Sequence, residues 1–184
     1  MNIRLSILLV AVLLIFGGTF LAVRLTRSAV KPPDPPWLYR IDEDSLVHIQ
    51  VSFGGQTVDY DRDPGSSTWY IQVNPPVPVS PKFSGPTQLL SGPQVNRLLA
   101  DAIDNPAAYG LDPPLGRIKI TERSGLVYEF HLGNPTPDQS NQYARLVGYP
   151  QLFTVPEIWA RVINKLATEP PYPPPEGEKP PGSR

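Results

Sequence analysis

The stretch GRIKITERSGLVYEFHL, residues 116–132, decides the fold. Apolar and polar side chains alternate before and after Ser124-Gly125, which is the pattern of two half-buried strands joined by a tight turn. The apolar positions of the two strands are in phase and form one predicted buried face, which consists of Ile118, Ile120, Tyr128, Phe130 and Leu132. The sequence therefore predicts an antiparallel hairpin with one face in a core.

The same alternation predicts further antiparallel strands on both sides of this hairpin. The strands expected before it span residues 46–53, 56–62 and 67–73, and those expected after it span 142–147 and 151–155. Gly54-Gly55 is typical of a two-residue hairpin turn. Asp63-Pro64-Gly65-Ser66 has proline at the second position and glycine at the third, which predicts a type II turn.

Two helices are predicted from their capping boxes and from apolar residues at helical spacing. The first follows a box at residues 91–94 and ends near Asp104, because Pro106 opposes continuation. The second spans 156–167 and starts with a box at residues 154–157. The expected order is βββ-α-ββββ-α, and the expected class is an α+β domain with helices on one face of an antiparallel sheet.

Residues 5–23 contain no charged side chain and predict a transmembrane helix before this domain. At about 1.5 Å per residue the run spans roughly 28 Å, close to the thickness of a bilayer core. A cleaved signal peptide is the alternative. Its apolar region is usually shorter, and Phe16 or Phe20 stands where a small residue is wanted for cleavage. We therefore expect a retained single-pass signal-anchor.

The chain divides into a short tail over 1–4, the membrane helix, a proline-rich tether over 24–45, the α+β domain over 46–167 and a proline-rich tail over 168–184. The positive charges that follow the helix favour a cytoplasmic domain, whereas the short N-terminal tail is typical of a signal-anchor. We expect the bacterial cytoplasmic membrane, with the domain outside the cytoplasm.

The composition excludes several chemistries. The formal net charge is −1, so no basic footprint indicates nucleic acid. The chain has no cysteine, which removes thiol catalysis and cysteine-ligated zinc. It has neither a G-x-S-x-G nucleophile motif nor a glycine-rich phosphate loop. We expect no catalytic residue, no cofactor and no bound metal.

The histidines and an aspartate triplet are the remaining candidates for chemistry. His48 and His131 fall on the polar sides of their strands, which predicts solvated surface histidines. Asp59, Asp61 and Asp63 resemble the start of a calcium loop. The match fails, because Pro64 and Tyr70 stand where that loop needs glycine and glutamate, so the triplet is predicted to lie on one solvent face of a strand.

NPAAYGLDPP, residues 105–114, is predicted to be a structural joint rather than a ligand-binding loop. Gly110 can take a positive φ, the flanking Tyr109 and Leu111 can fill the junction, and Asp112 precedes a proline and can cap backbone N–H groups. The motif consists of Tyr109, Gly110, Leu111, Asp112, Pro113 and Pro114. A separate contact surface is expected from the exposed tyrosines Tyr70, Tyr143 and Tyr149.

A resemblance to a known family rests on two blocks of the sequence. The first is YGLDPP at 109–114, and the second is LGNPTP at 132–137 followed by QYAR at 142–145. Over residues 46–166 the chain resembles the bacterial domain-of-unknown-function family 4340. The resemblance implies a membrane-anchored protein, often with its domain outside the cytoplasm and in some cases found with ABC-type transport components. It implies no activity and no active-site residues.

We therefore expect a non-enzymatic, membrane-anchored extracytoplasmic module that binds a membrane-protein partner as an accessory subunit. The alternative is an extracytoplasmic receptor or carrier for a small ligand or a cell-envelope polymer.

Overall fold

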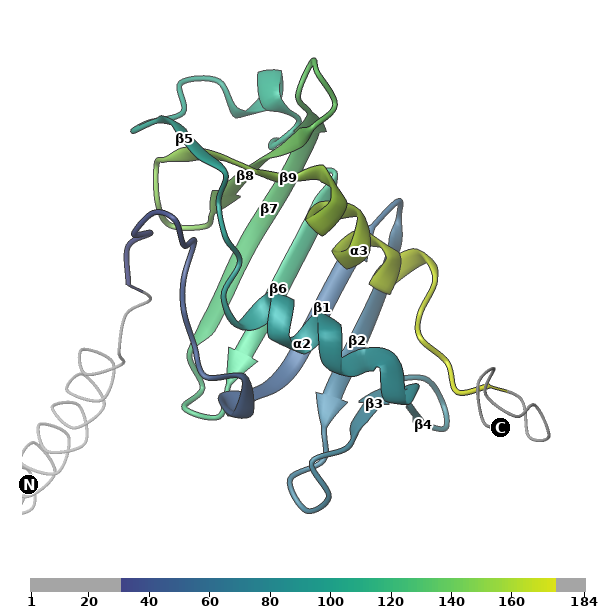
Figure 1. Ribbon diagram of the computed structural model, residues 1–184. Helices are drawn as coiled ribbons and strands as arrows, with labels where there is room; N and C mark the ends of the chain where they lie inside the picture. Colours follow the sequence, from purple (N-terminus) through teal and green to yellow (C-terminus); the bar gives the residue numbers. More distant parts are fainter. Residues whose placement is uncertain (1–30, 175–184) are drawn as a thin grey trace, which may run out of the picture. The chain divides into compact units, whose positions relative to one another are not determined.

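The computed structural model describes residues 31–174, which contain a nine-stranded sheet (Figure 1). The strand order is β4-β3-β2-β1-β6-β7-β8-β9-β5, and all neighbouring strands are antiparallel. The strands are β1 (Leu46–Phe53), β2 (Gln56–Arg62), β3 (Trp69–Ile71), β4 (Val77–Pro78), β5 (Arg97–Ala100), β6 (Gly116–Glu122), β7 (Val127–Pro135), β8 (Asn141–Leu146) and β9 (Leu152–Pro156). The helices are α2 (Ser84–Ser91) and α3 (Glu157–Thr168), with 3-10 turns η1 (Glu43–Ser45), η2 (Pro81–Phe83) and η3 (Pro106–Tyr109).

The predicted hairpin forms the middle of this sheet as β6 and β7. Ile118 pairs with Phe130 and Ile120 pairs with Tyr128, so the predicted buried face is in register. All five of its residues are buried. The other side of β6 pairs with β1, where Ile49 lies opposite Ile120. The first strands and the central hairpin therefore share one core.

Both helices lie on the same face of the sheet, which confirms the α+β class (Figure 1). The second expected helix is α3, which buries Trp159, Ile163 and Leu166. The Tyr60 hydroxyl of β2 donates a 2.6 Å hydrogen bond to the Leu166 carbonyl. The polar side chains of the central strands consequently face away from the helices.

The first expected helix is wrong. The helix in this region is α2, which ends at Ser91, and residues 97–100 form β5 beside β9. Leu98 and Leu99 lie at helical spacing from earlier apolar residues, yet they are 38% and 40% exposed. Pairing with β9 satisfies the backbone groups of the segment, and this tertiary contact outweighs the local helical pattern. The observed order is ββββ-α-βββββ-α.

Both predicted capping boxes are also absent, because their hydroxyl residues lie elsewhere. Ser91 is the last residue of α2, where its hydroxyl donates to the Gln88 carbonyl. Thr154 lies inside β9, between Arg97 and Tyr143 of the neighbouring strands. The helix α3 begins after Pro156 without a side-chain cap.

The third predicted strand is shorter than expected, and the turn before it is not type II. Gly65 does not have a positive φ, whereas Ser67 has a φ of 58°. The Asp63 carbonyl accepts a hydrogen bond from the Ser67 N–H, so the turn is one residue longer than a type II turn. β3 then starts at Trp69.

Part of the predicted tether joins the core. Leu38 and Tyr39 are buried, the Leu38 N–H donates to Pro93, and the Tyr39 hydroxyl donates to Leu90. The predicted membrane helix over 5–23 lies outside the described residues. Between residues 31 and 174, no helix is both long and apolar enough to span a bilayer.

Candidate functional site

The NPAAYGLDPP segment packs against the second distinctive block of the sequence. Gly110 ends η3 with a φ of 67°, which is the left-handed conformation that glycine favours. A Cβ atom at Gly110 would lie 2.4 Å from the Asn134 side-chain oxygen, and one at Gly133 would lie 2.1 Å from the Tyr109 carbonyl. These glycines let the two backbones approach each other, and Leu111 is fully buried between them. The YGLDPP and LGNPTP blocks therefore form one structural unit.

The other residues of the motif lie on the surface of this unit. Asp112 and Pro113 are exposed, and Pro114 is partly exposed. No hydrogen bond of the Asp112 carboxylate is found within residues 31–174, so the predicted capping contact is not seen there. Tyr109 is partly exposed, and its ring meets the Tyr143 ring edge-on with 5.0 Å between the centroids.

Tyr143 also borders a groove of about 360 Å³ next to the edge strand β5. We call it the β5 groove and define it by Arg97, Leu99, Thr136, Asp138, Asn141 and Tyr143. One wall is β5, and the other is the loop that follows the LGNPTP block. Asn96 donates a 2.9 Å hydrogen bond to Asn141 across one end. The groove therefore lies between the sheet edge and the second distinctive block, and Tyr143 connects it to Tyr109 of the first block.

The loop wall of the groove carries a fixed negative charge. The Asp138 carboxylate accepts hydrogen bonds from the Ser140 hydroxyl at 2.7 Å and from the Thr136 hydroxyl at 2.5 Å. These bonds lower the pKa of Asp138 to about 2. Arg97 on the opposite wall is exposed, so the groove presents one charge of each sign.

The β5 strand is the edge of the sheet, and its backbone is paired on one side only. β9 is its one neighbour among the described strands. A register irregularity falls between Leu98 and Ala100, at Leu99. The opposite edge, β4, is two residues long and contains Pro78. Short edges that contain proline are protected against further pairing, whereas β5 displays two leucines.

The predicted tyrosine surface is not assembled in the fold. Tyr70 lies on β3 and Tyr143 on β8, with four strands between them. At about 4.8 Å per strand step the separation is roughly 24 Å. Tyr149 lies in the turn after β8. All three are partly exposed, but of the three only Tyr143 borders the β5 groove.

The two histidines differ in their environments. His48 is partly exposed, and its Nδ1 lies 2.5 Å from Asp61 Oδ1 on the neighbouring strand. His131 is 7% exposed, so its prediction as a solvated residue is wrong. Its Nε2 lies 3.0 Å from Glu129, and Arg145 lies against its Nδ1 while donating to the Leu111 carbonyl. Burial lowers the pKa of His131.

Two members of the aspartate triplet, Asp59 and Asp61, lie against His48, and the third lies in the turn after β2. Asp59 accepts from Gln50, Asp61 lies against His48, and Asp63 accepts from the Ser66 N–H and hydroxyl in the turn. In the part of the chain that the structure describes, no group of three or more histidine, cysteine or acidic side chains is placed to hold a metal ion.

Sequence reasoning did not identify the β5 groove. It placed β5 in a helix, and residues 136–137 were treated only as part of a family marker. The available signal was the clustering of distinctive residues in two blocks, of which the second lines this groove in the fold.

A family model described as a domain of unknown function, DUF4340, matches residues 88–169. The match supports the predicted resemblance. It covers a narrower range than the predicted residues 46–166, and the strands β1 to β4 lie before it. It includes β5, η3 and both distinctive blocks. No curated protein and no solved structure matches the chain.

Proposed function

We propose that this protein is a non-enzymatic, membrane-anchored extracytoplasmic module that binds another protein of a membrane complex. The partner is a membrane protein, and an ABC-type transport component is the proposed class. Binding takes place at the β5 groove. The observation that carries the proposal is the exposed edge strand, with Leu98 and Leu99 on a strand that has one neighbour among the described strands.

The chemistry of the edge specifies the kind of segment that fits. An extended peptide adds to a free sheet edge through main-chain hydrogen bonds, and its side chains enter neighbouring pockets. Here the groove offers Leu99 and the Tyr143 ring as apolar contacts. Complete burial of a leucine side chain contributes about 1.5–3 kcal/mol, so covering the exposed 40% of Leu99 contributes about 1 kcal/mol.

Charged side chains at both ends of β5 would fix the direction of a bound segment. Arg97 begins the strand and Asp101 follows it, so an antiparallel partner segment is expected to carry an acidic residue opposite Arg97 and a basic residue opposite Asp101. Asp138 remains ionised at neutral pH and also favours a basic side chain in the groove. We infer an extended partner segment with an apolar centre and one charge of each sign.

A photo-crosslinking amino acid at position 99 of the full chain, expressed in its native membrane, tests this proposal. The expected product joins position 99 to a different membrane protein, and the adduct maps to an extended segment. Position 127 is the matched control, because Val127 is an aliphatic strand residue that is 47% exposed away from the groove. Equal yields of crosslinked partner from positions 99 and 127 would contradict the proposal.

A charge substitution gives the complementary measurement. The partner identified by crosslinking is then purified with the chain in mild detergent. Leu99→Lys should reduce its recovery by about fivefold, because the substitution places a charge in an apolar contact. Val127→Lys should leave recovery unchanged. A crosslink from position 99 to a second copy of this chain would show that the edge mediates self-association, and the proposed accessory role would then be wrong.

A further inference from the structure

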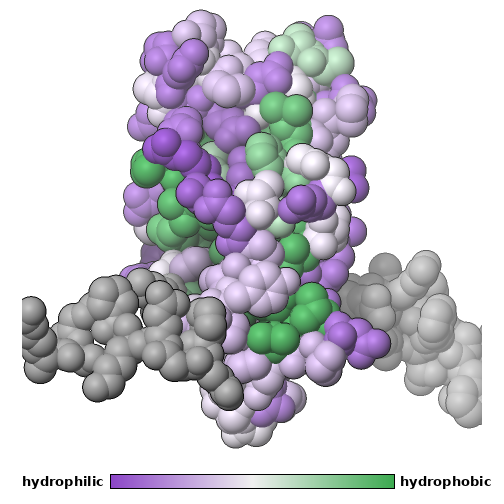
Figure 2. All heavy atoms as spheres, turned by 90° about the vertical axis from the view of Figure 1, so that its right-hand side faces the viewer, coloured by the Kyte–Doolittle hydropathy of each residue, from purple (hydrophilic) through white to green (hydrophobic). Residues whose placement is uncertain are grey.

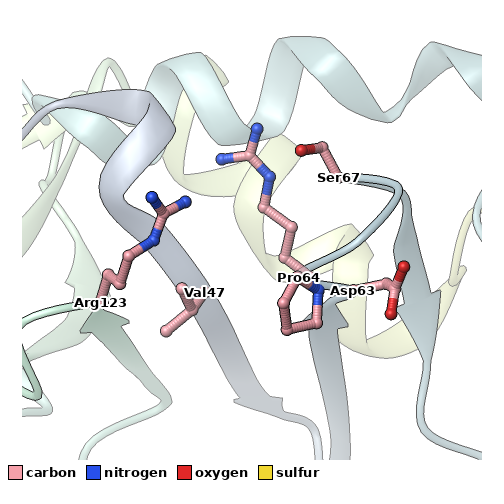
Figure 3. A pocket seen from close by; sticks show the side chains of 6 residues that line it. Val47, Asp63, Pro64, Ser67 and Arg123 are labelled. Carbon is pink, nitrogen blue, oxygen red and sulfur yellow. The ribbon is translucent and has the colours of Figure 1, made fainter.

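A second concave site lies beyond the β5 groove, at the end of β2 (Figure 3). It is a pocket of about 370 Å³, and we call it the arginine pocket. Its lining consists of Val47, Arg62, Asp63, Pro64, Ser67 and Arg123. The two arginines come from distant parts of the chain, from β2 and from the turn between β6 and β7.

The Arg62 guanidinium is held beside the pocket by Asp44. Its side chain is 15% exposed, its Nη1 donates to the Asp44 carbonyl at 2.9 Å, and its Nη2 donates to Asp44 Oδ1 at 3.1 Å. The Nε atom of Arg62 is buried, and within residues 31–174 it has no hydrogen-bond partner. Almost all buried donors in folded proteins have an acceptor, so this N–H marks an energetic cost of holding the Arg62 guanidinium beside the pocket.

Arg123 brings a second positive charge to the same place. Its Nη2 donates to the Asp44 carbonyl at 3.2 Å, so both guanidinium groups share one acceptor. Asp63 does not neutralise them, because its carboxylate bonds to Ser66 and lies on the opposite side of the pocket from Arg123 in Figure 3. The Asp44 carboxylate is the acid that contacts Arg62, and it is 85% exposed.

Ser67 adds a hydroxyl from an unusual backbone conformation. Its φ of 58° lies in the left-handed region, which non-glycine residues seldom adopt. The N–H of Ser67 donates to the Asp63 carbonyl and holds the residue there. Residues kept in such conformations are concentrated at ligand sites. Ser67 lines the same pocket as Arg62 and Arg123.

We propose that the arginine pocket binds a phosphate group. Planar guanidinium groups recognise tetrahedral oxyanions through forked hydrogen bonds, and a hydroxyl supplies a further donor. The remaining N–H groups of Arg123 and the Ser67 hydroxyl are the donors, and the Arg62 guanidinium contributes its positive charge from the lining of the pocket. Val47 and Pro64 form an apolar wall for the carbon skeleton that carries the phosphate. The site does not depend on the β5 groove.

Titration of inorganic phosphate into the full chain in detergent, followed by calorimetry, is the direct test. Arg123→Gln should weaken binding about tenfold or more, because a charge-assisted hydrogen bond is lost. Asp44→Asn should strengthen it about threefold, because a competing carboxylate is removed. Arg161→Gln is the matched control, since Arg161 is an exposed arginine that forms an ion pair with Glu157 and does not line the pocket.

The variants also separate binding from folding. Arg62→Gln should abolish phosphate binding, and its melting temperature without phosphate shows whether it folds. Arg123 is exposed, so Arg123→Gln carries the test if Arg62→Gln does not fold. Absence of phosphate binding, or equal loss in Arg123→Gln and Arg161→Gln, would overturn the proposal.

Free phosphate esters and lipid headgroups share this chemistry, and a second arm distinguishes them. Dihexanoyl phosphatidic acid, below its micelle concentration, is titrated in place of inorganic phosphate. Binding that is tighter than phosphate and lost in Arg123→Gln supports a lipid headgroup. Equal or weaker binding supports a free phosphate ligand, and binding unaffected by Arg123→Gln contradicts the site.

Discussion

Substitution of Gly133 by alanine should destabilise the domain strongly, because the added methyl group has no space. It would lie 2.1 Å from the Tyr109 carbonyl and 3.0 Å from the Leu111 side chain. The first contact is with backbone and the second is with a fully buried residue, so neither can move without disturbing the packed unit. Overpacking of this kind costs about 1–3 kcal/mol, and we expect a value near the upper end, about 3 kcal/mol.

Urea denaturation of the full chain in mild detergent, followed by tryptophan fluorescence, measures this loss. Gly65→Ala is the control, because its methyl group would meet nothing closer than 3.5 Å and Gly65 does not have a positive φ. Its unfolding free energy should stay within about 0.5 kcal/mol of the parent. A Gly133→Ala protein as stable as Gly65→Ala would refute the close packing of the two blocks.

Three further outcomes follow from the fold. Ile163→Ala should lower the unfolding free energy by about 2–4 kcal/mol, whereas Ile158→Ala, at a position 59% exposed, should change it by less than about 1 kcal/mol in the same urea assay. The pKa of His131 is lowered in the folded state, so the unfolded chain binds the proton first. Stability should therefore fall as the pH drops below about 6.5, and His131→Gln should reduce that fall; equal falls in both proteins would contradict this role. Protease added to intact spheroplasts should digest the domain, and full protection would place it in the cytoplasm.

The packed unit of the two blocks connects stability with the proposed partner site. Tyr109 lies against Tyr143, and Tyr143 lines the β5 groove. A change that loosens the glycine contacts should therefore disturb the groove as well as the fold. On the face shown in Figure 2, the apolar residues form separate patches among polar ones, so that view offers no competing continuous apolar surface among the described residues.

Sequence reasoning succeeded where a structural property depends on neighbours in the chain. The alternation over 116–132 identified the central hairpin and its buried face, because the two sides of a strand repeat every second residue. The apolar spacing of 156–167 identified α3, although its capping box was not formed. The positive φ of Gly110 was likewise suggested by the residues around it.

The tertiary structure decided the properties that depend on distant residues. The sequence of β5 has a helical apolar pattern, but the segment pairs with β9 and forms a strand of the sheet. His131 has a strand pattern that places it outward, and packing beside Arg145 and the Leu111 loop buries it. Arg62 and Arg123 have no local signature at all. They share the Asp44 carbonyl because the sheet brings the end of β2 close to the turn between β6 and β7, and periodicity cannot encode such long-range proximity.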